Sequence, residues 1–271
     1  MNRPPRIDYD ALEDRGFTIV PGLIGPDRLA AFEAQVAALG AAACRRLRIT
    51  PTAEEPFVDL CRRGGGYWSL FYKLLERLFV LERMNTDVGE RLAEWGFLDW
   101  AGFVSPAIWP DIRADPPDDG RMLLRVHQDF ASTRCHRAWR LWVPLRRADP
   151  HRGTMRVYPG SHKHGLLPHD MDDARYPVAP ERYWRDAPSE AIELPAGDGV
   201  LFHPLLLHES VPNRSARMKF TLLEQVQDLA SLCDPDDPDD AMAGFIELTE
   251  RRAAARAADE RRRTEAPREA S

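Results

Sequence analysis

The chain has 271 residues, of which 44% are hydrophobic and 30% charged, and its formal net charge is −6 at pH 7. This composition provides apolar side chains for a sizeable core and is that of a globular protein rather than a disordered one. A nucleic-acid partner usually requires a basic face, which this charge does not indicate, and no stretch approaches the roughly 20 apolar residues that span a bilayer. We therefore expect a cytoplasmic protein, monomeric or homodimeric, that acts on a small molecule and has no nucleic-acid or membrane partner.

The four cysteines do not indicate a zinc site or a disulfide framework. Cys44, Cys61, Cys135 and Cys233 lack the paired spacing of zinc ligands. A chain of this length does not need disulfide bonds to hold its core. We expect reduced thiols.

The N-terminal part, to about residue 96, is predicted to be mainly helical after one short strand at Phe17–Val20. Pro26, between Gly25 and Asp27, is a helix start signal, and apolar residues recur at helical spacing as far as Leu39. Residues 57–63 and 68–95 are predicted to be further helices. The second of these is expected to bury a stripe made of Leu70, Leu74, Leu78 and Leu81.

From about residue 97 the pattern changes to short apolar runs separated by Pro, Gly and Asp, which favours an antiparallel sandwich or barrel. We expect one domain over residues 1–248, with its β core at about 97–230. The predicted strands are residues 103–108, 122–130, 139–145, 154–158, 192–194, 200–203, 205–208 and 217–225.

Two segments differ from this body. Residues 170–190 are rich in Asp, Arg, Tyr and Pro, and such long loops often cover a binding site. Residues 249–271 form a charged C-terminal tail of Ala, Arg and Glu with almost nothing to bury, and are predicted to be a solvated helix or a frayed end.

The sharpest local feature is the triplet His127, Gln128, Asp129. On a strand, side chains alternate between faces, so His127 and Asp129 point the same way and Gln128 points away. Two histidines and one carboxylate on one side of a metal are the ligands of non-haem Fe(II) oxygenases. Because a single triplet of this kind is a weak signal, a second histidine is needed.

That histidine is expected at the end of a later strand, where His203 and His208 compete for the role. We favour His208, because Ser210 shares its face and cations follow at Arg217 and Lys219, where a co-substrate carboxylate would need a partner. His203 is then a packed residue near the site.

Five stretches of the chain are more specific together than any one of them alone. They are residues 16–23 (Gly-Phe-Thr-Ile-Val-Pro-Gly-Leu), the triplet at 127–129, residues 142–145 (Trp-Val-Pro-Leu), residues 153–163, and the run at 197–215. In these stretches the chain resembles the phytanoyl-CoA dioxygenase family of Fe(II)/2-oxoglutarate oxygenases, over roughly residues 8–227.

The resemblance implies a mainly β fold with flanking helices around a double-stranded β-helix (jelly-roll, cupin-like) core. It implies an iron site made by His127, Asp129 and His208, with 2-oxoglutarate chelating the iron and O₂ as the other co-substrate. The expected reaction is hydroxylation of an unactivated C–H, coupled to decarboxylation of 2-oxoglutarate to succinate and CO₂. Related halogenases lack the carboxylate, so Asp129 disfavours halogenation. Ser210 is expected to hydrogen-bond the co-substrate carboxylate.

The chain departs from the family pattern in two places. The family usually has an arginine eleven residues after the distal histidine, where it holds the far carboxylate of 2-oxoglutarate, and this chain has Lys219 there. Arg217, two residues earlier and on the same face by alternation, is the other candidate, because a lysine cannot form the bidentate fork of a guanidinium. An acidic-Asn-Gly turn of the family is replaced here by His151, Arg152 and Gly153.

Three residues, Arg125, Trp142 and His162, are candidates for contact with the substrate. Arg125 lies two residues before His127 and would share its face, where a buried arginine needs an anionic partner. Trp139 and Trp142 are three apart and should face opposite ways, with one in the core and one over the cavity; His162 is expected in a loop near the cavity mouth. With the arginines of residues 134–140, Arg125 indicates a small polar or anionic biosynthetic substrate.

Two other functions remain open. A cupin-like isomerase or hydrolase would keep the three ligands without using O₂, and a non-catalytic jelly-roll binding module would hold no metal.

Overall fold

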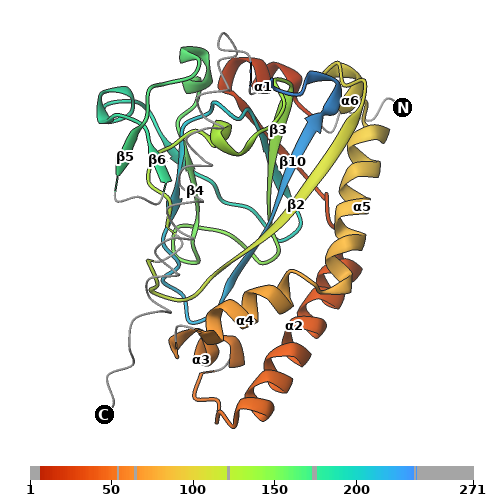
Figure 1. Ribbon diagram of the computed structural model, residues 1–271, viewed down its shortest axis with the longest axis vertical. Helices are drawn as coiled ribbons and strands as arrows, with labels where there is room; N and C mark the ends of the chain where they lie inside the picture. Colours follow the sequence, from red (N-terminus) through yellow and green to blue (C-terminus); the bar gives the residue numbers. More distant parts are fainter. Residues whose placement is uncertain are drawn as a thin grey trace.

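The computed structural model describes residues 7–53, 55–63, 66–120, 123–172, 176–234 and 236. Within these residues the helices precede most of the strands along the chain (Figure 1). The helices are α1 (Tyr9–Arg15), α2 (Pro26–Leu47), α3 (Pro56–Arg62), α4 (Gly66–Leu75), α5 (Phe79–Glu94) and α6 (Phe97–Trp100). The strands are β1 (Phe17–Val20), β2 (Pro106–Asp115), β3 (Ala138–Pro144), β4 (Thr154–Val157), β5 (Asp170–Asp172), β6 (Tyr176–Val178), β7 (Glu190–Ala191), β8 (Gly199–Phe202), β9 (His208–Val211) and β10 (Lys219–Asp228).

The strands form two main antiparallel sheets. The larger sheet has the order β1-β8-β3-β10-β2, and the smaller sheet has the order β7-β4-β9. β5 and β6 pair antiparallel as a separate two-stranded sheet. This is the predicted double-stranded β-helix core with flanking helices.

One face of the larger sheet packs against helices. Phe220, Leu222 and Val226 of β10 are buried in one apolar cluster with Phe32 of α2 and Val88 of α5. Figure 1 shows α5 running beside β2, and residues of the two elements are in contact. We call this the outer face.

The opposite, inner face of the larger sheet packs against the smaller sheet. Trp142, Val200 and Phe202 are buried here with Met155 and Val157 of β4. Trp139 packs with the outer cluster instead, so the expectation that the two tryptophans face opposite ways is confirmed. Because strand side chains alternate, the inner face also receives every second residue of β2 and β10.

The helix predictions are correct at the N-terminus and partly wrong further on. β1 and the start of α2 lie where they were predicted. The predicted buried stripe is confirmed only in its second half, where Leu81 is buried and Leu78 packs against the same core. Its first half is wrong, because the chain leaves the helix between α4 and α5 and the face is not continuous. Leu70 and Leu74 are 49% and 42% exposed, and Phe71 and Leu75 are buried in their place.

The strand predictions differ most around residues 103–130. β2 extends further than predicted, because Pro110 ends the strand-like pattern of apolar residues in the sequence. Proline is tolerated at this position because β2 is an edge strand of the sheet. The predicted strand at 122–130 is not found in its described part, residues 123–130: His127 makes one isolated bridge to His208, and a 3-10 helix begins at Asp129. β9 begins at His208, so residues 205–207 precede the strand rather than form it.

The described part of residues 170–190 packs close to His127 and His208. Tyr183 and Trp184 pack on a cluster that includes Val126 and Leu207, the chain neighbours of His127 and His208. The tail at residues 249–271 lies outside the described residues. No helix in the described ranges is long and apolar enough to cross a membrane.

Candidate metal centre

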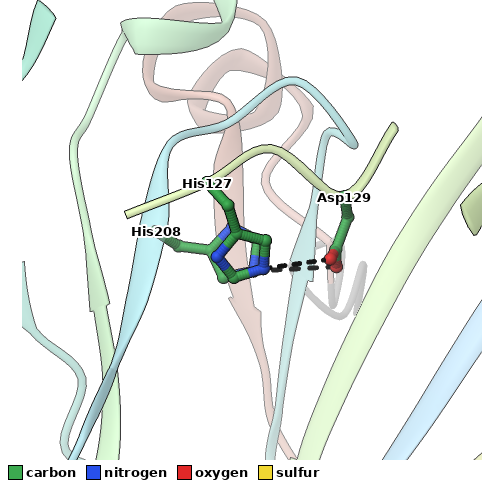
Figure 2. A group of neighbouring side chains, drawn as sticks. All are labelled: His127, Asp129 and His208. Carbon is green, nitrogen blue, oxygen red and sulfur yellow. Dashed lines mark ion pairs between the residues drawn. The ribbon is translucent and has the colours of Figure 1, made fainter. Parts of the chain in front are cut away.

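His127, Asp129 and His208 meet on the inner side of the core (Figure 2). Backbone hydrogen bonds set their positions: His127 and His208 exchange N–H···O bonds of 3.0 and 3.1 Å, and the Asp129 N–H donates to Pro204 O at 2.8 Å. One potential ligand atom from each residue lies within 4.8 Å of the other two. A turn beside β9 therefore presents two ligands, and β9 presents the third.

The donor atoms of the three residues face one another and are shielded from solvent. His127 Nε2 is 3.3 Å from Asp129 Oδ1, and His208 Nε2 is 3.6 Å from Asp129 Oδ2. The three residues are 1%, 5% and 6% exposed, in chain order. Two imidazoles and a carboxylate that point at one place are a divalent-metal donor set.

Both imidazoles are held by the nitrogen that does not face Asp129. His127 Nδ1 lies 2.7 Å from Arg125 O, and His208 Nδ1 lies 3.0 Å from Leu206 O. Donation of Nδ1–H to a carbonyl leaves the Nε2 lone pair for a metal. Burial and the neighbouring His127 lower the pKa of His208 to about 4, so this ring is neutral at pH 7.

Arg140 orients the carboxylate. From the inner face of β3 its Nε donates to Asp129 Oδ2 at 2.8 Å. Burial alone would raise the pKa of Asp129, but Arg140, His208 and His127 together hold it well below its ordinary value. The sequence indicated Arg140 only as part of an arginine-rich stretch. Its contact with the site could have been suspected from strand alternation, which places Arg140 on the same face as Trp142.

Gln128 points away from the cluster, as predicted. Its Nε2 donates to Gly165 O at 2.9 Å and Leu205 O at 2.7 Å, and its Oε1 accepts from Leu167 N at 3.0 Å. The alternation that separates it from His127 and Asp129 holds, although the segment is a bridge and a turn.

The two cations that follow His208 occupy different places. Lys219 is buried at the start of β10, with Nζ 2.8 Å from Asp115 Oδ2 and 5.8 Å from the centre of the Trp142 ring. Arg217 precedes the strand, its side chain is 54% exposed, and it lies 3.6 Å from Glu33. The expected shared strand face is therefore wrong, because β10 does not extend back to Arg217.

Ser210 lies on β9, two residues from His208. Its Oγ accepts from Leu124 N at 3.1 Å, and its backbone N–H donates to Leu124 O at 2.9 Å. These two hydrogen bonds connect the segment before His127 to β9.

Arg125 and His162 are not brought to the cluster. Arg125 is exposed and acts electrostatically on Glu181. Its expected inner-face position is wrong, because residues 123–126 do not form a strand. The His162 ring lies 3.1 Å from Glu13 O at the end of α1.

Gly16 explains why His162 fits there. This glycine has a φ of +82°, and a Cβ at its position would come within 2.4 Å of the His162 ring. The ring therefore occupies the space that a side chain at residue 16 would fill. Of the three substrate candidates, only Trp142 lies on the inner face with the metal cluster.

Known proteins with similar sequences identify the family of this chain. The family model for phytanoyl-CoA dioxygenase (PhyH) matches residues 12–221. The peroxisomal phytanoyl-CoA dioxygenase of Rattus norvegicus is 27% identical over 221 residues, which cover 75% of this chain and 62% of the rat protein. The chain thus spans less than two thirds of that relative.

Solved structures show the same fold. EvdO2 from Micromonospora carbonacea var. aurantiaca, complexed with 2-oxoglutarate, has a TM-score of 0.56 and 22% identity over 86% of this chain and 95% of its own. The non-heme alpha-ketoglutarate-dependent epimerase SnoN has a TM-score of 0.50 and 20% identity over 81% of this chain and 79% of its own. With the family model matching most of its length, this chain belongs to the phytanoyl-CoA dioxygenase family.

Proposed function

We propose that the protein is an Fe(II)- and 2-oxoglutarate-dependent dioxygenase in which His127, Asp129 and His208 bind the iron. The observation that carries this proposal is the buried set of two imidazoles and one carboxylate, with both Nε2 atoms turned toward Asp129. The donor types suit Fe(II), since imidazole and carboxylate ligands on one side leave the other side open. The residues present therefore fit the group that the family implies.

The neighbouring residues would hold that arrangement while a metal binds. The carbonyls of Arg125 and Leu206 fix both imidazole tautomers, and Arg140 keeps Asp129 ionised and oriented. Such contacts with ligand residues typically change metal affinity by about 10- to 100-fold when removed.

Lys219 is the residue we propose as the anchor of the far carboxylate of 2-oxoglutarate. Trp142 lies one inner-face position from Arg140 along β3, about 6.5–7 Å away, and Arg140 contacts Asp129. The Lys219 ammonium lies over this Trp142 ring, so it faces the inner side near the metal ligands. Arg217 does not, because it lies outside the strand and beside Glu33.

A bound iron with 2-oxoglutarate would supply the oxidising chemistry, and we propose hydroxylation of an unactivated C–H as its outcome. The protein's own residues orient the ligands, and the buried apolar side chains of Trp142 and Phe202 would help to exclude water on this side of the sheet. The SnoN epimerase shares the fold, so the fold alone does not select the reaction. A small polar or anionic substrate stays a prediction, and the exposed Arg125 does not support it. A cytoplasmic location also stays a prediction.

The test is succinate formation from 2-oxoglutarate under Fe(II) and ascorbate, together with anaerobic Mn(II) binding. We expect one ion per chain, and we expect His127→Ala, Asp129→Ala and His208→Ala each to abolish turnover while the melting transition remains. His203→Asn is the matched control, since His203 is a nearby histidine that packs on Trp139 outside the cluster.

Three results would overturn the proposal. Full activity of Asp129→Ala without added carboxylate would show that Asp129 is not an iron ligand. Metal binding without 2-oxoglutarate consumption would favour a cupin-like isomerase or hydrolase. Absence of metal binding would favour a non-catalytic jelly-roll module.

A further inference from the structure

The inner face of the larger sheet is covered over some strands and exposed over others. The smaller sheet packs on β3 and β8, where Trp142, Val200 and Phe202 are buried with residues of β4. Beyond β3 on the same sheet lie β10 and the edge strand β2. Trp109 of β2 is 65% exposed, so a large aromatic side chain is accessible at this edge.

Strand pairing places Trp109 in line with a residue that contacts a metal ligand. Arg140 of β3 contacts Asp129 and is opposite Gln225 of β10. Gln225 is in turn opposite Trp109 of β2, and residues opposite one another share a face. Neighbouring strands are about 4.7–4.9 Å apart, so Trp109 lies roughly 10 Å across the sheet from Arg140. A small molecule that stacks on Trp109 can therefore extend to the metal ligands.

Arg134 lies one position further along this face. Its backbone N–H donates to Gln227 Oε1 at 3.0 Å, and Gln227 is the inner-face residue that follows Gln225 on β10. The next residue, Cys135, makes an isolated bridge, is buried, and interacts electrostatically with Asp228 on the outer side. Alternation then turns the Arg134 side chain toward the inner side. We call Trp109, Gln225 and Arg134 the open region.

One end of the Arg134 guanidinium is buried without a partner. Its Nη1 has no hydrogen-bond acceptor in the part of the chain that the structure describes, whereas Arg140 donates to Asp129. The carboxylate of Asp111, on the same face of β2, interacts electrostatically with Arg140 and Arg113. Buried polar groups almost always have a partner, and a buried cation requires an anionic one. An anionic group on a ligand would satisfy Arg134.

We propose that the open region binds the substrate, with an anionic group on Arg134 and a flat ring on Trp109. The substrate class is then a small ring-bearing carboxylate or a similar anion. An aromatic side chain offers a large face for stacking, and a guanidinium matches a carboxylate as a fork. This rests on the proposed function, which supplies the oxidation of the bound molecule. It gives the predicted anionic substrate a support that Arg125 does not.

The experiment measures probe binding by anaerobic calorimetry on the full chain loaded with Mn(II) and 2-oxoglutarate. The probes are phenylacetate, phenylpropanoate and phenylbutanoate, which differ in the distance from ring to carboxylate, and each is compared with its neutral amide. A hydrogen bond between charged groups corresponds to roughly ten- to hundredfold in affinity. We expect at least one carboxylate to bind more tightly than its amide by about that factor.

Two variants test the two contacts separately. Arg134→Met should abolish the preference for the carboxylate over its amide. Trp109→Ala should weaken both probes alike, by about two- to tenfold, because it removes only the stacking contact. Arg147→Met is the matched control and should change neither, since Arg147 is an exposed arginine beside Asp149, outside β10 and β2.

The melting temperature distinguishes recognition from a structural role of Arg134. Arg134→Met should melt at the wild-type temperature or above it without probe, because it removes a buried unsatisfied group. A lower melting temperature together with equal weakening of carboxylate and amide would overturn the proposal, since it would show that Arg134 supports the fold.

The outcomes also separate this proposal from the function on which it rests. If the wild-type protein binds Mn(II) but no 2-oxoglutarate, the proposed function fails, and probe binding to the metal-free chain still tests the open region. If the wild type binds 2-oxoglutarate but none of the carboxylates, or binds each carboxylate no better than its amide, the open region is not an anion site. An Arg134→Met protein that keeps the preference would exclude Arg134 as the residue responsible.

Discussion

The two faces of the larger sheet are buried to a similar degree but carry different chemistry. β10 sends Phe220 and Leu222 to the outer face and Lys219 and Thr221 to the inner face, and all four are 7% exposed or less. On the outer face these residues join an apolar core, whereas on the inner face Lys219 pairs with the buried Asp115. Burial alone therefore does not distinguish the two faces of β10, whereas the polarity of their side chains does.

Glu224 is the exception on the outer face. It alternates with Leu222 and Val226, is 0% exposed, and its carboxyl oxygens have no hydrogen-bond partner among the described residues. Arg140 and Lys219 on the inner face each have a carboxylate partner. The predictions below test whether the inner-face charges act in binding and whether Glu224 only reduces stability.

The largest effect is expected at Arg140. Arg140→Met removes the cation beside the buried Asp129, and loss of one partner of a buried pair typically costs about 3–5 kcal/mol. We expect that loss in the free energy of unfolding of the metal-free protein, measured in urea. Added Mn(II) should recover part of it, because the ion replaces the lost positive charge. Equal loss with and without Mn(II) would mean that Arg140 has only a structural role.

Glu224 should make stability fall as pH rises. Burial raises its pKa from the ordinary 4.5 to about 8, so between these pH values the folded protein keeps a proton that the unfolded chain has released. Stability contributed by the protonated form is therefore lost with rising pH, by roughly 3 kcal/mol between pH 4.5 and 7.

Glu224→Leu should remove most of this pH dependence and raise the melting temperature at pH 7. Glu193→Leu, at an exposed position, is the control and should change neither. A Glu224→Leu protein with the wild-type pH profile would show that this carboxyl is paired in solution.

Substitution of Lys219 and of Arg217 compares a buried cation on the inner face with an exposed cation outside the strand. A charge-assisted bond to a carboxylate contributes about 1.5–3 kcal/mol, so Lys219→Ala should raise the apparent KM for 2-oxoglutarate roughly ten- to hundredfold. Arg217→Ala should do less, because Arg217 is exposed and faces Glu33. The reverse order would make Arg217 the anchor, and no effect of either would argue against 2-oxoglutarate as co-substrate.

The smallest effect is expected from the C-terminal tail. Residues 251–271 have no apolar side chain larger than that of Ala or Pro, so their deletion should leave melting temperature and 2-oxoglutarate turnover nearly unchanged. A large loss of either quantity would show that the tail packs or mediates assembly.

The sequence by itself determined the features that depend on local pattern. The triplet at His127 and Asp129, the choice of His208, the strand β1 and the start of α2 follow from spacing and from helix start signals, which act over a few residues. The five matching stretches indicated the family and with it the double-stranded β-helix, which the sheet topology shows.

Only the tertiary structure decided which distant residues meet. A period-two pattern assigns faces within a strand but not the residue where the strand begins, and this is why Arg217 was wrongly placed beside Lys219. The pairs Arg140 with Asp129 and Arg113 with Asp115 depend on how the chain folds around β3 and β2. Strand pairing joins residues far apart in sequence, so its register is set by packing of the whole core.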